Sequence, residues 1–301
     1  MKPFKNWMIC LDLTGIDDFL LDYANFLAGK FKPETITVLH IIEQTEIYRE
    51  LPDLFPEVNG PEELRILIME ELEEKLDILS DSGAALSIIL EDGNTTDTII
   101  RVMNDTDPDL LVMGKKIGYE GEGVTSKKIA RYVSCSVLFV PENARHQLQH
   151  ILIPVNFNER SAQALQVGSS IAQVCRADIT AQHIYKYPPQ FFPGIPVDEF
   201  KEKMKIPLEK KLDKFRKDYS PGDNIRYIFT LNRNSKVPDK VYDQSVRDQS
   251  DMIIAGTKYR STLANVLVDD LADRLIPYPF GIPLLIVKNK KEPGRMPGGS
   301  Q

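Results

Sequence analysis

Cysteine is scarce in this 301-residue chain, and long apolar runs are lacking. Cys10, Cys135 and Cys175 each lie in apolar sequence, which predicts buried free thiols in a reducing compartment and argues against a disulfide framework. No apolar run approaches the ~20 residues that a membrane-spanning helix needs. The first residues enter a strand-like run without an apolar leader or a small-residue cleavage site. We therefore expect no signal peptide, no membrane partner and a cytoplasmic location.

An excess of basic residues is also missing. The formal net charge is -7, whereas nonspecific binding to nucleic acid depends on a basic surface, so no nucleic-acid partner is expected. The chain contains no HExxH zinc motif and no G-x-S-x-G elbow. His146 and His150 lie apart from any cluster of cysteines or carboxylates. The sequence therefore nominates no catalytic residue and no metal site.

What the chain does contain is an internal repeat. Four segments recur in the same order at offsets between 142 and 147 residues. The pairs are WMICLDL from Trp7 and HILIPVN from His150, TITVLHII from Thr35 and DITAQHIY from Asp178, PDLLVMGKK from Pro108 and SDMIIAGTK from Ser250, and CSVLFVP from Cys135 and IPLLIVK from Ile282. The sequence therefore predicts two copies of one domain, over residues 1–143 and 150–290, followed by a flexible tail over 291–301.

Each copy has the pattern of strands alternating with helices. The strands are near-continuous runs of Val, Ile and Leu, which is typical of a parallel sheet covered by helices on both faces. We predict an α/β fold of two tandem Rossmann-like domains, each with a five-stranded parallel sheet. The expected strands lie near residues 7–12, 35–42, 85–91, 109–113 and 136–140, and near 150–155, 178–184, 225–231, 251–255 and 283–287.

The carboxyl ends of two expected strands carry residues suited to a ligand. In parallel α/β sheets, ligands bind outside the carboxyl ends of the strands, at the switch point. Asp12 ends the first strand of the first copy, and a loop with several glycines and two lysines follows the fourth. Glycines let the backbone approach a phosphate, and successive N–H groups attract the anion. A flexible surface turn without a ligand is the alternative interpretation.

In this order, the segments resemble the universal stress protein family in its tandem two-domain form. The resemblance rests on VMGKKIGYEG, CSVLFVP, TVLHII and the strand that ends at Asp12, and it covers nearly the whole chain up to Lys290. It implies domains of the adenine nucleotide alpha hydrolase-like type, a role in stress survival, ATP or AMP as ligand, and frequent dimers. Family members that bind ATP carry a G-x2-G-x9-G-[ST] loop after strand four. An Asp at the end of strand one contacts the nucleoside.

The first copy keeps the glycines of that loop and changes their spacing. Gly118 follows Gly114 after three residues where the family has two, and Gly123 comes about four residues early. Thr125 and Ser126 lie close to the position of the family's Ser or Thr. We therefore leave open whether the shortened loop still holds a phosphate.

The second copy keeps the spacing and loses the residues. Counting from Gly256, Asp269 and Asp270 occupy the Gly-Ser positions, and Asn156 replaces the Asp at the end of strand one. A carboxylate about 4 Å from a phosphate charge costs roughly 4 kcal/mol at an effective dielectric near 20, whereas a helix N-terminus returns only about 0.3–1 kcal/mol. We therefore interpret the second copy as degenerate for nucleotide.

The resemblance thus places the candidate site in the first copy, where we expect a nucleotide-sensing or protein-interaction module of the stress response with an unidentified protein partner. The alternatives are a slow ATPase, a small-ligand enzyme that uses the same loop, and a binder of a different apolar ligand. His40 and His183 are interpreted as structural. The candidate ligand-binding residues are Leu11, Asp12, Ile41, Met113, Gly114, Lys115, Gly118, Gly123, Thr125 and Ser126.

The last strand of each copy predicts how the copies assemble. An exposed last strand leaves backbone groups unpaired, and a short linker makes pairing within the chain favourable. Residues 1–145 carry 14 Lys and Arg against 27 Asp and Glu, and residues 146–301 carry 23 against 17, so the halves should attract each other. We predict that Val137–Phe139 and Leu284–Ile286 lie side by side in an intramolecular pseudo-dimer. The same argument leaves room for a homodimer.

Overall fold

The computed structural model describes residues 4–43, 60–116, 122–188, 194–257 and 271–288. The strands of this part of the chain are β1 (Asn6–Leu11), β2 (Thr35–Ile42), β3 (Ala85–Asp92), β4 (Leu110–Lys115), β5 (Ser136–Pro141), β6 (His150–Pro154), β7 (Asp178–Lys186), β8 (Ile225–Asn232), β9 (Met252–Gly256) and β10 (Leu284–Val287). The helices are α1 (Ile16–Phe31), α3 (Pro61–Leu76), η1 (Asp77–Ser82), α4 (Thr95–Thr106), α5 (Glu122–Tyr132), α6 (Glu159–Cys175), α7 (Val197–Tyr219), α8 (Val237–Arg247) and α9 (Leu271–Leu275). The strands begin and end within about two residues of their predicted positions.

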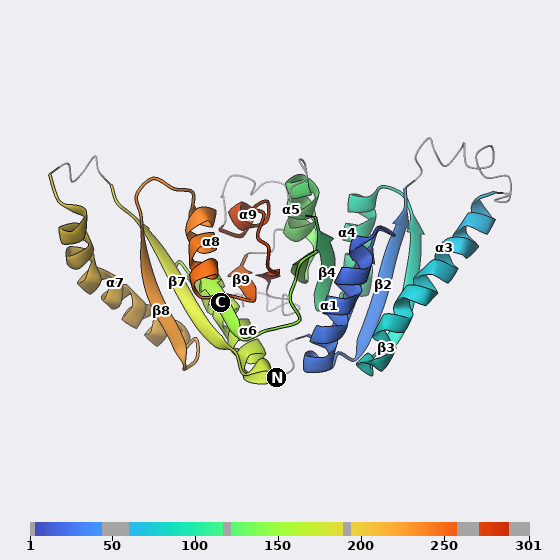
Figure 1. Ribbon diagram of the computed structural model, residues 1–301, viewed down its shortest axis with the longest axis horizontal. Helices are drawn as coiled ribbons and strands as arrows, with labels where there is room; N and C mark the ends of the chain where they lie inside the picture. The colour runs from blue at the N-terminus through green and yellow to red at the C-terminus, as the bar shows by residue number, and fades with distance from the viewer. Residues whose placement is uncertain (1–3, 44–59, 117–121, 189–193, 258–270, 289–301) are drawn as a thin grey trace, which may run out of the picture.

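The strands form one continuous sheet in the order β3-β2-β1-β4-β5-β10-β9-β6-β7-β8 (Figure 1). We call residues 4–141 the first half and residues 150–288 the second half. Within each half the neighbouring strands are parallel and follow the same order. The predicted α/β fold of two Rossmann-like units is therefore confirmed.

Helices cover both faces of the sheet and bury two apolar cores. Successive strand residues point to opposite faces, so Trp7 and Ile9 pack under α1 and α3, whereas Met8 packs on the other face. The first core also contains residues of α6 and α7, and the second contains residues of α4, α5, α8 and α9. Each core continues from one half into the other, which joins the halves through buried apolar surface.

The junction between the halves is the antiparallel pair of β5 and β10. Val137–Phe139 lie opposite Leu284–Ile286, with Leu138 paired to Leu285. The prediction that the two last strands lie side by side is confirmed. A homodimer stays a prediction.

Polar contacts reinforce this junction on one face of the sheet. Lys115 is buried, and its Nζ donates to the carbonyl oxygens of Ile276 (2.7 Å) and Tyr278 (2.6 Å) in the second half. Arg131 of α5 forms a two-pronged ion pair with Asp273 of α9, at 3.0 and 2.9 Å. This pair runs against the predicted attraction, because its basic member belongs to the acidic half. The net charges of the halves therefore do not account for this ion pair.

Two further predictions meet the structure here. Cys135 is buried, which confirms the prediction for this thiol, whereas Cys10 and Cys175 are half-buried when the whole residue is considered. All three are free. No helix in the described ranges has the length and apolar character needed to cross a membrane. The predicted tail over 291–301 lies outside the described residues.

Candidate functional site

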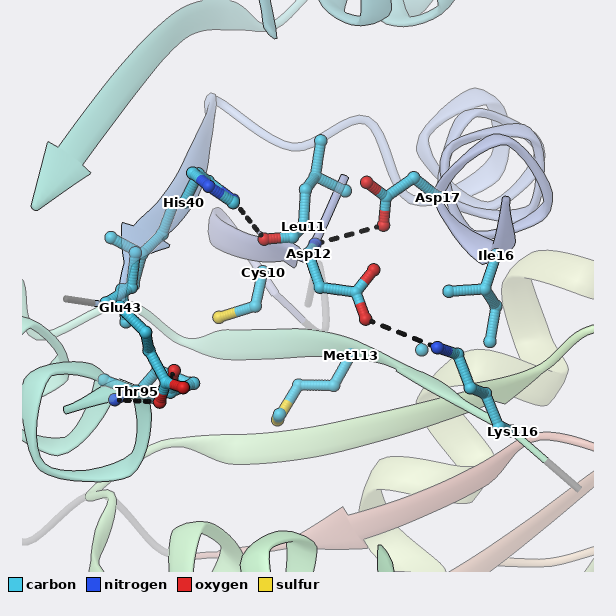
Figure 2. Close-up of a pocket in the computed structure, with 14 residues that line it drawn as sticks. Cys10, Leu11, Asp12, Ile16, Asp17, His40, Glu43, Thr95, Met113 and Lys116 are labelled. Carbon is cyan, nitrogen blue, oxygen red and sulfur yellow. Dashed lines mark hydrogen bonds and ion pairs between the residues drawn. The ribbon is translucent and has the colours of Figure 1, made fainter. Parts of the chain in front are cut away.

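A cavity of about 400 Å³ opens at the carboxyl ends of β1, β2 and β4 (Figure 2). We call it the first-half cavity. It lies where β1 separates β2 from β4, which is the switch point of a parallel α/β sheet. Its lining residues are Cys10, Leu11, Asp12, Ile16, Asp17, Leu39, His40, Ile41, Glu43, Thr95, Ile99, Met113, Gly114 and Lys116.

A buried carboxylate organises the turn between β1 and α1. Asp17 accepts hydrogen bonds from the backbone N–H groups of Asp12 (3.3 Å) and Leu13 (2.8 Å), and its side chain is almost fully buried. Leu13 adopts a left-handed conformation with φ of 55°, so the turn is tight. Burial raises the pKa of Asp17 to about 6, although the two N–H groups oppose this shift. Asp17 therefore holds Asp12 in position at the edge of the cavity.

Asp12 itself remains open to a ligand. Its Oδ1 accepts from the backbone N–H (3.1 Å) and the hydroxyl (2.6 Å) of Thr14, and its Oδ2 lies 3.8 Å from the Nζ of Lys116. The Asp12 side chain is 56% exposed, so part of the carboxylate faces solvent and the cavity. Figure 2 shows Asp12 between Asp17 and Lys116. This side of the cavity thus combines a hydrogen-bond acceptor with a nearby cation.

The opposite side of the cavity carries a second anchored carboxylate. Glu43, next to the end of β2, accepts from the backbone N–H (3.0 Å) and the hydroxyl of Thr95 at the start of α4. These hydrogen bonds lower the pKa of Glu43. Cys10 and Met113 lie between the two polar sides (Figure 2). The cavity therefore has an apolar middle between two polar ends.

His40 and Cys10 have roles that do not favour chemistry. His40 is buried, and its Nδ1–H donates to the carbonyl oxygen of Leu11 (2.9 Å), which ties the end of β1 to β2. Although Cys10 as a whole residue is half-buried, desolvation of its sulfur raises the pKa of the thiol strongly, so the thiol stays protonated at neutral pH. Both side chains therefore support the cavity wall.

Five of the predicted site residues meet in this cavity, and one lies elsewhere. Lys115 was expected to face the ligand, but its amine reaches into the second half. Side chains alternate along a strand, so Lys115 points to the face opposite Gly114, and Lys116 takes the place expected for it. The predicted residues that line the cavity are Leu11, Asp12, Ile41, Met113 and Gly114.

The remaining predicted residues belong to the loop and to α5. Gly118 lies outside the described residues. Gly123 lies in the first turn of α5, where only the backbone is described. Thr125 and Ser126 lie in the same helix and are not among the described residues that line the cavity.

Sequence reasoning also missed several lining residues. Glu43 and Thr95 follow β2 and β3, so the same carboxyl-end rule could have identified them. Asp17 carried no comparable signal, because an acidic residue in the first turn of a helix is common.

The second half has an equivalent but smaller cavity of about 230 Å³, which we call the second-half cavity. Matching hydrogen bonds establish the equivalence, because the Nδ1–H of His183 donates to Val155 (2.9 Å) as His40 does to Leu11. Its lining residues are Pro154, Val155, Asn156, Gln182, Ile184, Lys186, Asn232, Val237, Leu271 and Arg274.

A glycine common to both halves is explained by packing in the second. A Cβ at Gly256 would lie 2.1 Å from the carbonyl oxygen of Arg160 in α6, so no other residue fits without moving the helix. At Gly114 a Cβ would meet only the Ile16 side chain, whose nearest atom, Cδ1, would lie 3.1 Å away. The glycine therefore persists in the second half without requiring a phosphate.

Comparison with known proteins agrees with this architecture. Residues 3–141 match the model of the universal stress protein family. A universal stress protein from Archaeoglobus fulgidus DSM 4304 has a TM-score of 0.62 and 14% identity, covering 94% of this chain and 98% of its own. A functionally unknown protein from Pseudomonas aeruginosa PAO1 has a TM-score of 0.55 and 14% identity, covering 95% of this chain and 93% of its own. No curated protein sequence matches. At these identities the solved structures establish a common fold across both halves.

Proposed function

We propose that the first half, which matches the model of the universal stress protein family over residues 3–141, binds ATP or AMP as a sensing module of a stress response. The observation that carries the proposal is the first-half cavity, which brings Leu11, Asp12, Ile41, Met113 and Gly114 together at the switch point of the sheet. Its volume of about 400 Å³ lies within the usual range for small-molecule sites, roughly 300–1,000 Å³.

The distribution of charge suggests how a nucleotide would lie. Asp12, Asp17 and Glu43 make the interior acidic, which suits an uncharged nucleoside and disfavours phosphate groups there. The free oxygen capacity of Asp12 suits the hydroxyl groups of a ribose. Lys116 provides positive charge beside Asp12, so the phosphates would point outward past Lys116.

The cavity is better suited to binding a ligand than to catalysing a reaction. The protonated thiol of Cys10 is a poor nucleophile, and His40 uses its Nδ1–H on the backbone of Leu11. Asp17 and Glu43 are each held by backbone N–H groups. These side chains shape a cavity and do not pair a nucleophile with a base.

Calorimetric titration of the full chain with ATP, AMP and adenosine tests the proposal. We expect one site per chain for ATP or AMP. Asp12→Asn retains the oxygen that accepts from Thr14 and removes the charge, so binding should weaken about tenfold or more through loss of a charge-assisted hydrogen bond. Asn156→Ala changes the equivalent residue of the second half and is the matched control, with unchanged affinity.

Three results would contradict the proposal. The first is the absence of binding by all three compounds to the folded chain. The second is a stoichiometry of two, and the third is a loss of affinity in Asn156→Ala that equals the loss in Asp12→Asn.

A further inference from the structure

We propose that the second-half cavity binds a small organic anion that also carries a hydroxyl or amino group. This cavity is separate from the one assigned to the nucleotide, so the inference does not depend on that assignment. It rests on the charge of the lining residues, on a buried amide and on the size of the cavity.

The two cavities have opposite charge at equivalent positions. Hydrogen bonds define the equivalence: the N–H of Asp12 donates to Asp17, and the N–H of Asn156 donates to the hydroxyl of Ser161 (2.9 Å). Glu43 and Lys186 each lie three residues after the histidine that contacts the first strand. Every carboxylate of the first-half cavity is thus replaced by a neutral or basic residue, in the pairs Asp12 and Asn156, Asp17 and Ser161, and Glu43 and Lys186.

The described lining of the second-half cavity contains basic residues where the first half has carboxylates. Lys186 and Arg274 are among its described lining residues, and none of those residues is a carboxylate. A positive, partly enclosed cavity attracts an anion.

Gln182 supplies the second requirement. It is fully buried, and its Nε2 donates to the Thr230 hydroxyl (3.0 Å) and to the Lys240 carbonyl oxygen (3.0 Å). Because a carbonyl oxygen can only accept, these contacts determine the orientation of the amide. The Oε1 atom then has no hydrogen-bond partner in the described structure. A buried acceptor without a donor is costly, so a ligand hydroxyl or amino group would satisfy it.

The difference between the two halves at the position of Gln182 also favours a ligand with a polar group. The residue of the first half equivalent to Gln182 is Leu39, which lies one residue before the histidine in β2 as Gln182 does in β7. An apolar wall has therefore been exchanged for a polar one. Asn156 and Asn232 add further amide groups to the lining.

The volume limits the size of the ligand. About 230 Å³ is below the usual lower limit of roughly 300 Å³ for drug-sized ligands, which favours a ligand smaller than a nucleotide. A molecule of a few carbons with one anionic group and one donor group matches the lining. The anionic group is either a carboxylate or a phosphate ester, since both suit a cationic site.

Titration of the full chain with glycerate, glycerol 3-phosphate and glycerol tests the proposal by calorimetry. We expect saturable binding of one molecule per chain by at least one of the two anions, and none by glycerol at the same concentrations. The two anions separate a carboxylate preference from a phosphate preference. ATP should not displace the bound anion, and Asp12→Asn should leave its affinity unchanged.

A charge-matched pair of variants locates the site. Lys186→Glu introduces the residue that the first half has at this position, and should weaken anion binding about tenfold or more. Lys210→Glu makes the same change in net charge at an exposed position of α7, which covers the other face of the sheet, and should have no effect. Asn156→Asp, which adds a carboxylate to the lining, should also weaken binding. Circular dichroism and thermal unfolding confirm that each variant is folded.

The proposal is wrong if neither anion binds the folded chain, or if glycerol binds as well as the anions do. It is also wrong if Lys186→Glu and Lys210→Glu weaken binding equally, because nonspecific attraction would then explain the result. Nucleotide titrations on the same samples keep this outcome separate from a failure of the first-half site.

Discussion

The two halves of the sheet share the contacts that maintain the fold and differ in those that face a ligand. Asp109 accepts from the N–H groups of Lys5 and Asn6 (both 3.0 Å) and so secures the start of β1. Asp251 does the same for β6, accepting from the N–H groups of Gln149 (2.7 Å) and His150 (3.0 Å). The cavities, by contrast, have opposite charge. The contacts that maintain the fold are therefore the same in both halves, whereas the residues that line the two cavities differ.

The two equivalent glycines offer the most severe test of this comparison. Gly256→Ala would place a Cβ 2.1 Å from the backbone oxygen of Arg160, so we expect a loss of about 3 kcal/mol or more in the free energy of unfolding. Gly114→Ala would contact a side chain and not a backbone, with Cδ1 of Ile16 nearest at 3.1 Å, so the free energy of unfolding should fall by only about 1 kcal/mol. Urea unfolding of both variants provides the measurement.

Equal losses in the two variants would break the comparison, because the glycine would then serve packing in both halves. Gly114→Ala should in addition weaken ATP binding, since Gly114 lines the first-half cavity. Retention of full ATP affinity would show that the ligand does not approach the backbone there.

The buried carboxylate of the first half should make stability depend on pH in a way that the second half does not. The pKa of Asp17 is about 6 in the folded protein, above the ~3.9 of an unfolded chain. The folded state therefore binds the extra proton between these values, and stability falls as pH rises from about 4 to about 6, by on the order of 2 kcal/mol. Asp17→Ser, which introduces the residue found at Ser161, should remove this part of the slope.

Unfolding of the wild-type chain and of Asp17→Ser at four pH values between 4 and 7 isolates the effect, because all other carboxylates are common to both. Parallel curves would contradict the assignment. A difference that grows toward low pH in favour of the wild type would support it.

The strands and the location of the first-half cavity could be predicted from the sequence, and the direction of individual side chains could not. Buried strands are recognisable in the sequence as runs of Val, Ile and Leu. The rule that ligands bind at the carboxyl ends of parallel strands assigned Asp12 and Gly114 to the same site. Lys115 and Lys116 are adjacent and identical, so composition cannot tell which one faces the ligand. Strand alternation decides it, once the face of Gly114 is known.

The residues that distinguish the two cavities were harder to recognise for a different reason. Lys186 and Glu43 become comparable only when the hydrogen bonds of His183 and His40 align the two halves. Gln182 looks like an ordinary polar residue in a strand until its burial and its unsatisfied oxygen are known. The net charges of the halves suggested an attraction, whereas the ion pair between Arg131 and Asp273 has its basic member in the acidic half.

The smallest predicted effect concerns the helix that follows the third strand of each half. In the first half Asn94 caps α4, and its side chain accepts from the N–H of Asp97 (3.2 Å). The equivalent residue before α8 is Lys236, which has an extended backbone suited to a cap but cannot accept a hydrogen bond. Lys236→Asn should therefore stabilise the chain by about 0.5–1 kcal/mol. The asparagine side chain provides an oxygen that can accept from the backbone N–H of Asp239, and the change removes a positive charge from a helix N-terminus. Asn94→Ala should lower the free energy of unfolding by a similar amount. Both changes are measurable by urea unfolding at neutral pH, and a destabilised Lys236→Asn would mean that the lysine has a role in the second half that its counterpart in the first half lacks.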